Sequence, residues 1–156
     1  MPLVNDWRYL SREGPSSYDN VGPTFTVPVR EVWHVLSVWV EYTASDTAAT
    51  RALRLVVQDD TDDIMLEIAP GVTVTASQQR DFLFAPGAPD LTSARDTDLI
   101  MTPLPAALIL RPGWDLSVVE LSSGDTSDSE ILLVQLNYAK MAVLSTDGST
   151  PQSSDN

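Results

Sequence analysis

Residues 32–59 read VWHVLSVWVEYTASDTAATRALRLVVQD, and this stretch decides the class of fold. Two runs of alternating apolar and polar residues flank a short polar loop, a pattern typical of β-strands. The apolar positions of the two runs are Val32, Leu36, Val38, Val40 and Tyr42, then Leu53, Leu55 and Val57. The stretch predicts a β-hairpin whose apolar face contributes to the inner layer of a β-sandwich.

The rest of the chain repeats this pattern between turn signals. Further strands are expected in segments rich in β-branched, aromatic and leucine residues: 24–30, 63–69, 114–121 and 131–142. Segments 72–76 and 80–85 form one interrupted strand or two short ones, and segments 99–101 and 106–110 form one strand that is kinked by prolines or starts late. Glycine, proline and acidic residues separate these segments, and no helical periodicity interrupts them. We expect an all-β chain that forms a single β-sandwich of jelly-roll type, with about eight antiparallel strands and an extended N-terminal arm.

The expected organisation has three parts: an N-terminal arm over 1–23, the jelly-roll sandwich over 24–142, and a polar C-terminal tail over 143–156. The arm combines Trp7, Tyr9 and Leu10 with the cations Arg8 and Arg12. These aromatic and aliphatic side chains are too apolar for a freely solvated segment. The arm is therefore expected to dock, either on its own sandwich or on a neighbouring protein.

Length and charge restrict the classes of function. A chain of 156 residues suits one domain with a full core. The formal net charge of −13 repels phosphate backbones, so we expect no nucleic-acid partner. No apolar run approaches the ~20 residues of a membrane helix, and no signal-peptide pattern opens the chain. The absence of cysteine excludes disulfides and thiolate metal sites.

Few residues suggest catalysis. His34 is the one histidine and lies within a strand, so a structural role is expected rather than a metal site or a catalytic triad. The acidic clusters do not have calcium-loop spacing and are interpreted as solvated turns: Asp59, Asp60, Asp62 and Asp63, then Asp125, Asp128 and Glu130. We expect no catalytic residue, no cofactor and no metal ion. A carboxylate-based glycosidase is the remaining enzymatic alternative.

Trp33, Val35 and Trp39 alternate with the predicted core positions of the first run. A sheet face in contact with water normally carries polar residues, so these three predict a second face that is also covered. The cover is the chain's own arm or a loop, another subunit, or a sugar stacked on the tryptophans. Aromatic residues are enriched at protein interfaces. The predicted partner or subunit interface comprises Trp7, Arg8, Tyr9, Leu10, Arg12, Trp33, Val35 and Trp39.

Three segments carry a resemblance to a known family: EVWHVLSVWVEYTASDTAATRALRLVVQDD (31–60), LPAALILRPGWDLSVVEL (104–121) and ILLVQLNYAK (131–140). Their order of strands and turns, over residues 24–140, resembles the jelly-roll capsid decoration (cement) proteins of tailed bacteriophages. The resemblance implies a non-enzymatic structural protein, made in the host cytoplasm, that binds the major capsid protein on the outer surface of the head. It also implies a homo-oligomer, with a trimer favoured.

Two alternatives remain open at this point, because β-sandwiches serve many functions. One is a tail, neck or fibre-attachment protein of the phage on the same fold. The other is a carbohydrate-binding module that uses Trp33 or Trp39 as stacking platforms.

Overall fold

The computed structural model describes residues 8–13, 21–90, 98–123 and 130–142. These residues form ten strands: β1 (Arg8–Glu13), β2 (Val21–Thr26), β3 (Glu31–Thr43), β4 (Thr50–Gln58), β5 (Ile64–Ile68), β6 (Gln79–Pro86), β7 (Leu99–Leu104), β8 (Leu108–Leu110), β9 (Asp115–Ser123) and β10 (Glu130–Ala142).

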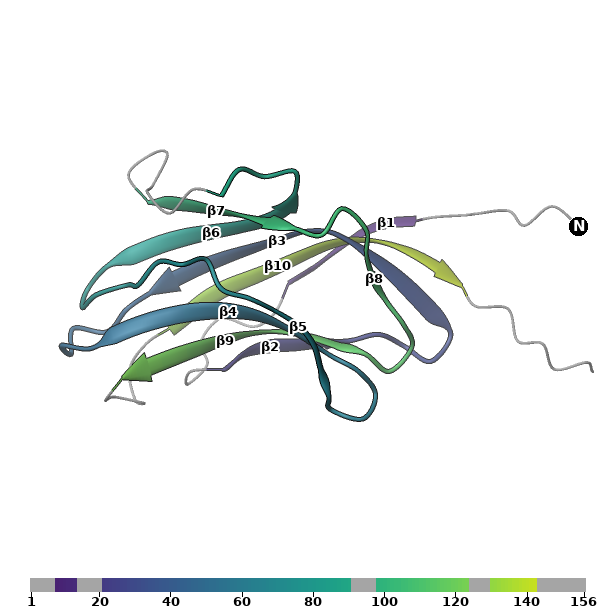
Figure 1. The fold of residues 1–156 in the computed structure, drawn as a ribbon, viewed down its shortest axis with the longest axis horizontal. Coiled ribbons are helices and arrows are strands. Elements are labelled where there is room, and N and C mark those ends of the chain that lie inside the picture. Colours follow the sequence, from purple (N-terminus) through teal and green to yellow (C-terminus); the bar gives the residue numbers. More distant parts are fainter. Residues whose placement is uncertain (1–7, 14–20, 91–97, 124–129, 143–156) are drawn as a thin grey trace, which may run out of the picture.

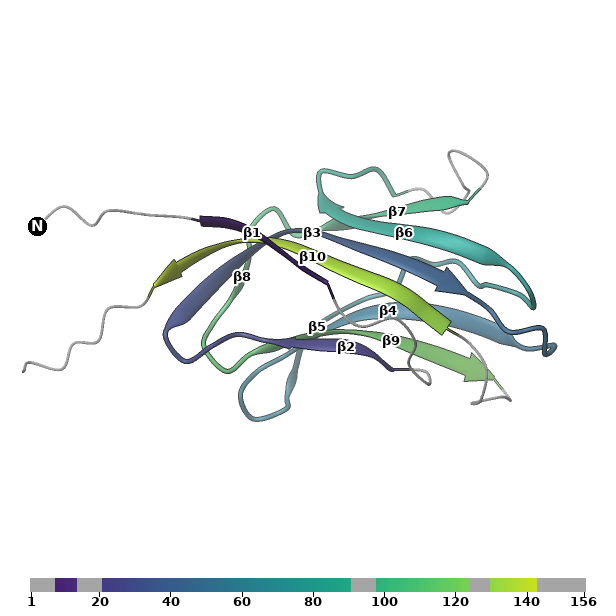
Figure 2. The same cartoon turned by 180° about the vertical axis from the view of Figure 1, so that it is seen from behind.

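The strands lie in two facing layers (Figures 1 and 2). The upper sheet in Figure 1 has the order β1-β10-β3-β6-β7, and β8 pairs with β3 at its side. The lower sheet has the order β2-β9-β4-β5. The prediction of an all-β sandwich is confirmed.

The pairing of the strands is nested, as in a jelly roll. β1 pairs with β10, β2 with β9, β3 with β6 and β4 with β5, each pair antiparallel. The first half of the chain thus lies along the second half as a ribbon of paired strands. This ribbon rolls up into two sheets, because β10 also pairs with β3 and β9 also pairs with β4. The predicted number of about eight strands fits this roll. β7 and β8 form in the segment predicted as one kinked strand, and the parallel pairing of β7 with β6 was not predicted. The expected strand over 72–76 is absent apart from an isolated bridge between Val74 and Arg51.

The predicted hairpin is wrong, because its two strands lie in different sheets. β3 belongs to the upper sheet and β4 to the lower sheet, so residues 44–49 carry the chain across the edge of the sandwich. Alternation of apolar residues determines which face of a strand is buried, but it does not select the neighbouring strand. The loop also lacks the two-residue Asn-Gly type of turn that specifies a tight hairpin.

The core lies between the two sheets and consists of fully buried aliphatic and aromatic side chains. The upper sheet contributes Val38, Val40, Phe82, Phe84 and Val134, and the lower sheet contributes Leu53, Leu55, Leu116 and Val118. Burial of each such side chain contributes about 1.5–3 kcal/mol. This continuous apolar layer holds the sheets together.

A β-bulge in β3 reverses the orientation of its first residues. Asn137 pairs with Ser37 but the next residue, Tyr138, pairs with Val35, so Leu36 is the extra residue. Trp33 and Val35 consequently point into the core, with 0% of their surface exposed. The ring of Trp33 lies 4.3 Å from that of Tyr138, between centroids, and its Nε1 donates to Glu31 Oε2 at 2.7 Å.

The bulge corrects two predictions from the simple alternation of β3. Trp33 and Val35 were expected on a partner-facing surface, and they are core residues instead. Val32 and Leu36 were expected in the core, and they are only half-buried. No sequence signal locates the extra residue of this bulge. An alternation of inward and outward residues that is continued past Leu36 toward the N-terminus therefore assigns the residues of β3 before Leu36 to the wrong face of the sheet.

β1 and the first residues of β2 lie within the stretch 1–23 that was expected to be an arm. β1 pairs with β10 from Arg8 opposite Lys140 to Glu13 opposite Gln135, and β2 begins at Val21. The β1 segment therefore docks on the chain's own upper sheet. Trp7 and the expected tail over 143–156 lie outside the described residues.

Candidate docking surface

On the side of the upper sheet that faces away from the core, a patch of seven side chains forms a surface that we call the outer face. It comprises Trp39, Glu41, Asp81, Leu83, Leu99, Met101 and Leu133. Directly paired residues of a sheet share a face. Trp39 pairs with Leu83, which pairs with Met101, so these three side chains form one row across three strands. Their strand neighbours, such as Val38 and Val40, are fully buried in the core.

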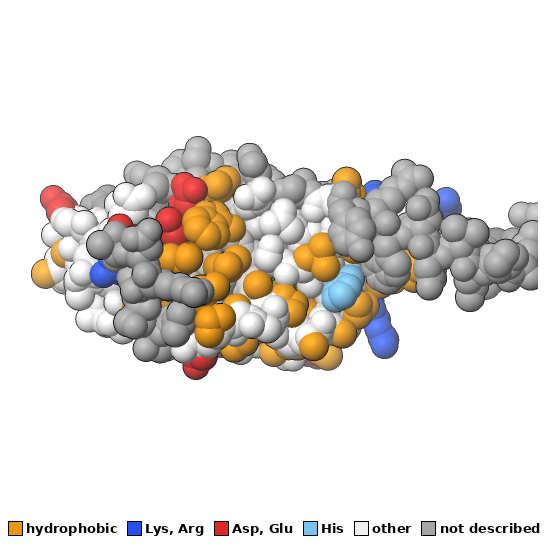
Figure 3. Space-filling model, turned by 90° about the horizontal axis from the view of Figure 1, so that it is seen from above, with side chains coloured by type: hydrophobic (Ala, Val, Ile, Leu, Met, Phe, Trp, Pro, Cys, Tyr) orange, Lys and Arg blue, Asp and Glu red, His pale blue; other side chains and the backbone are white. Residues whose placement is uncertain are grey.

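Most of the outer face is apolar, and polar residues border it: Gln135 lies opposite Trp39, and Thr43 pairs with Gln79 in the row beyond Glu41 and Asp81. A sheet face in contact with water usually carries polar side chains at these alternate positions, yet five of the seven residues here are apolar and all seven are only half-buried. Figure 3 looks down on this sheet and shows hydrophobic side chains gathered over it, with acidic side chains beside them. A contiguous apolar area of this kind is typical of a protein–protein contact.

Two carboxylates lie within the apolar area, on adjacent strands. Glu41 of β3 pairs directly with Asp81 of β6. The indole Nε1 of Trp39 donates a long hydrogen bond of 3.4 Å to Glu41 Oε1. Burial raises the pKa of Asp81 above its ordinary value, and the negative charges of Glu41 and Asp98 raise it further. Asp98 itself forms a 2.6 Å ion pair with Arg80.

The predicted interface residues do not form one surface. Trp39 lies on the outer face, and Trp33 and Val35 lie in the core. Leu10 is 39% exposed on β1, opposite Tyr138. The backbone positions of the other β1 members are Arg8 opposite Lys140, Tyr9 opposite Ala139 and Arg12 opposite Leu136. Trp39 pairs with Gln135 instead, so the predicted β1 anchors are displaced from it along the sheet.

Sequence reasoning missed most of the outer face. Leu83, Met101 and Leu133 join Trp39 only through strand pairings that no local pattern specifies. A signal is nevertheless present, because the corresponding strands carry apolar residues at consecutive positions, as in DFLFA (81–85), LIM (99–101) and ILLV (131–134). Apolar residues on both parities of a strand predict that both of its faces are covered.

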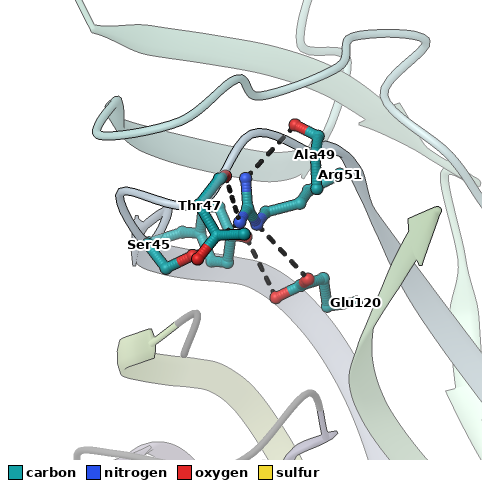
Figure 4. A network of polar contacts seen from close by, with 6 residues as sticks. Ser45, Thr47, Ala49, Arg51 and Glu120 are labelled. Atoms are coloured by element: carbon teal, nitrogen blue, oxygen red, sulfur yellow. Dashed lines mark hydrogen bonds and ion pairs between the residues drawn. The ribbon is translucent and has the colours of Figure 1, made fainter. Parts of the chain in front are cut away.

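A second feature is a buried ion pair between the sheets, at the end where residues 44–49 cross over (Figure 4). Arg51 of β4 and Glu120 of β9 are almost completely buried, and Arg51 Nε lies 3.9 Å from Glu120 Oε1. The hydroxyl of Tyr42, from β3 of the opposite sheet, donates to Glu120 Oε2 at 2.9 Å. The pair therefore joins the two layers by polar contacts.

The guanidinium of Arg51 also binds the crossover loop. It donates at 2.6–3.2 Å to three acceptors of that loop, namely Ser45 Oγ and the carbonyl oxygens of Thr47 and Ala49. A buried cation requires such partners, because an unpaired charge in the interior is strongly destabilising. The arrangement is structural: it determines where the chain leaves the upper sheet and enters the lower one.

The acidic turn between β4 and β5 is stabilised by hydrogen bonds to the side chain of Asp59. Asp59 Oδ1 accepts hydrogen bonds from the backbone N–H groups of Thr61 and Asp63 and from the hydroxyl of Thr61, at 2.8–3.0 Å. The hydrogen bonds of Thr61 lower the pKa of Asp59. Asp60, Asp62 and Asp63 are exposed, which agrees with the prediction of a solvated turn. Of the second acidic cluster, Asp125 and Asp128 lie outside the described residues.

His34 is half-buried and pairs with Ile109 and Ala139, on the side away from the core because of the bulge. Within the described residues, no group of three or more His, Cys, Asp or Glu side chains could hold a metal ion. That same part of the chain contains no helix long and apolar enough to cross a membrane.

Comparisons with known proteins give little further information. No protein-family model matches the chain, and no curated protein matches it significantly. The chain is similar to solved structures of infectious bursal disease virus: the Gx strain (TM-score 0.30, 9% identity, 95% of this chain and 33% of that one), the Gt strain (0.34, 10%, 90% and 36%) and the T13 viral particle (0.33, 9%, 89% and 36%). The chain thus spans about a third of the length of these proteins. At such TM-scores the similarity carries no argument about what this chain does.

Proposed function

We propose that the chain is a non-enzymatic structural protein of a virus particle, a decoration protein that coats the outer surface of a bacteriophage head. The observation that carries the proposal is the apolar outer face of the upper sheet, which is half-exposed on an otherwise acidic chain. The sequence resemblance to phage cement proteins supports it, and so does the nested jelly-roll pairing. The protein would act by contact, stabilising the head through surface that it buries against the major capsid protein.

The copy number of the chain in purified phage particles tests this proposal. Quantitative mass spectrometry should find the chain in many copies per particle, at a simple ratio to the number of copies of the major capsid protein. The absence of the chain from particles would contradict the proposal. A few copies per particle, in multiples of three or six, would favour the alternative of a tail, neck or fibre-attachment protein.

The proposal includes a homo-oligomer, with a trimer favoured as in the resembling family. Native mass spectrometry of the purified protein should show a closed oligomer. A monomer at every concentration would remove this part of the proposal while leaving the docking surface intact.

The carbohydrate-binding alternative loses one of its two expected platforms, because Trp33 is fully buried. Trp39 remains half-buried on the outer face and could stack on a sugar ring. A glycan array separates the two functions: the decoration proposal expects no binding, and a signal lost in Trp39→Ala would favour the sugar.

A further inference from the structure

The outer face contains an unfavourable pair of charges in its last row, next to the polar pair Thr43 and Gln79. Like charges placed directly opposite each other on adjacent strands destabilise a sheet, and Glu41 and Asp81 are such a pair. Apolar side chains lie at both ends of their row, Leu133 and Leu99, and in the row on one side, Trp39, Leu83 and Met101. This surrounding weakens the solvation of Asp81, in agreement with the rise of its pKa on burial.

Nothing in the described part of the chain neutralises the pair. The ion pairs found there join Arg51 to Glu120, Arg54 to Glu67, Arg80 to Asp98 and Lys140 to Glu31, and none includes Glu41 or Asp81. Within the same described residues, the side-chain hydrogen bond to Glu41 is the long one from Trp39. Among the described residues, therefore, the two carboxylates have no cationic partner.

We infer that the outer face binds a protein surface that inserts a lysine or arginine side chain between Glu41 and Asp81, with its apolar stem on Trp39 and Leu83. The charges select this occupant: an apolar partner would bury two unpaired carboxylates, and an acidic partner would be repelled. An arginine or lysine pairs with the carboxylates, and the face of the indole also attracts a cation. The inference rests on the proposed function only in naming the partner, which would be the major capsid protein.

The inference predicts opposite effects of one substitution on folding and on docking. Asp81→Asn removes a like charge from the free protein, so the melting temperature of the free protein should rise. The same substitution removes an acceptor for the partner's cation, so the dissociation constant for phage heads that lack this chain should rise on the order of 10- to 100-fold. Glu41→Gln should act in the same two directions.

Asp60→Asn is the matched control, because it removes the same charge from the exposed acidic turn outside the outer face. It should leave docking unchanged. The salt dependence of docking should weaken in Asp81→Asn but persist in the control. If wild-type protein binds heads and Asp81→Asn binds them equally well, the inference is wrong and the proposed function stands.

Failure of wild-type protein to bind heads would overturn the proposed function but not the inferred site. A small probe tests that site independently. The probe is n-butylguanidinium, which has the apolar stem and charged group of an arginine side chain. Its titration into the free protein should shift the carboxyl NMR signals of Glu41 and Asp81 saturably, with no such shift from n-butanol and none in Asp81→Asn. An unsaturable or absent response in wild-type protein would overturn the inference.

Discussion

The buried ion pair of Arg51 and Glu120 makes the strongest prediction for stability. Glu120→Gln keeps the size of the side chain and an acceptor for the Tyr42 hydroxyl, but it removes the negative charge. Two unit charges about 4 Å apart interact by about 4 kcal/mol at an effective dielectric constant of 20, and the atoms here are 3.9 Å apart. Removing one partner of a buried pair usually costs about 3–5 kcal/mol, because the other charge stays buried.

We therefore expect Glu120→Gln to lower the free energy of unfolding by about 3–5 kcal/mol, a large share of the ~5–15 kcal/mol of a typical domain. Urea denaturation followed by tryptophan fluorescence measures this loss, with an unchanged slope indicating that the unfolded state is the same. The double variant Arg51→Met/Glu120→Leu should lose less than Glu120→Gln, because it leaves no buried charge. A loss below about 1 kcal/mol in Glu120→Gln would refute the reasoning.

Three further predictions concern packing and pH. A Cβ at Gly22 would lie 2.9 Å from the carbonyl oxygen of Val118. Gly22→Ala should therefore lower the free energy of unfolding by about 1–3 kcal/mol in urea denaturation. An unchanged free energy would show that β2 and β9 move apart at little cost. Trp33→Phe should lower the melting temperature more than Trp39→Phe, since only Trp33 is fully buried and bonded to Glu31; the reverse order would contradict the assigned bulge. The pKa of Asp59 is lowered in the folded state, so its stabilising effect is present above the ordinary value of 3.8 and is lost as the pH falls through the folded value. The stability difference between wild type and Asp59→Asn should accordingly shrink at acid pH, measured by denaturation at a series of pH values, and a constant difference would argue against the turn.

Local patterns predicted the strands well and their arrangement poorly. The alternation of Leu53, Leu55 and Val57 correctly identified core positions of β4, because burial of one face has a strict period of two. The same rule failed in β3 at Leu36, since one extra residue reverses the period. The pairing of strands was beyond local patterns: β3 and β4 are adjacent in sequence, yet they belong to opposite sheets.

The candidate site shows the same limit. Trp39 was identified from the sequence because a tryptophan at an outward position of a strand is unusual. Its neighbours Leu83 and Met101 come from β6 and β7, and the parallel pairing of these two strands has no local sequence signature. Glu41 and Asp81 each look like an ordinary polar residue on a strand, and their opposition appears only once the register is known.

Oxidative footprinting tests the central claim, that the protein coats the head through its outer face. Hydroxyl radicals modify Trp39 and Met101, which are half-buried on the outer face, and also Met65, which is 52% exposed on β5 of the other sheet. Free protein should be modified at all three positions. On the decorated head, the account predicts protection of Trp39 and Met101 together, with Met65 still reactive. Protection of Met65 with unchanged reactivity of Trp39 and Met101 would contradict it and would place the contact on the opposite sheet.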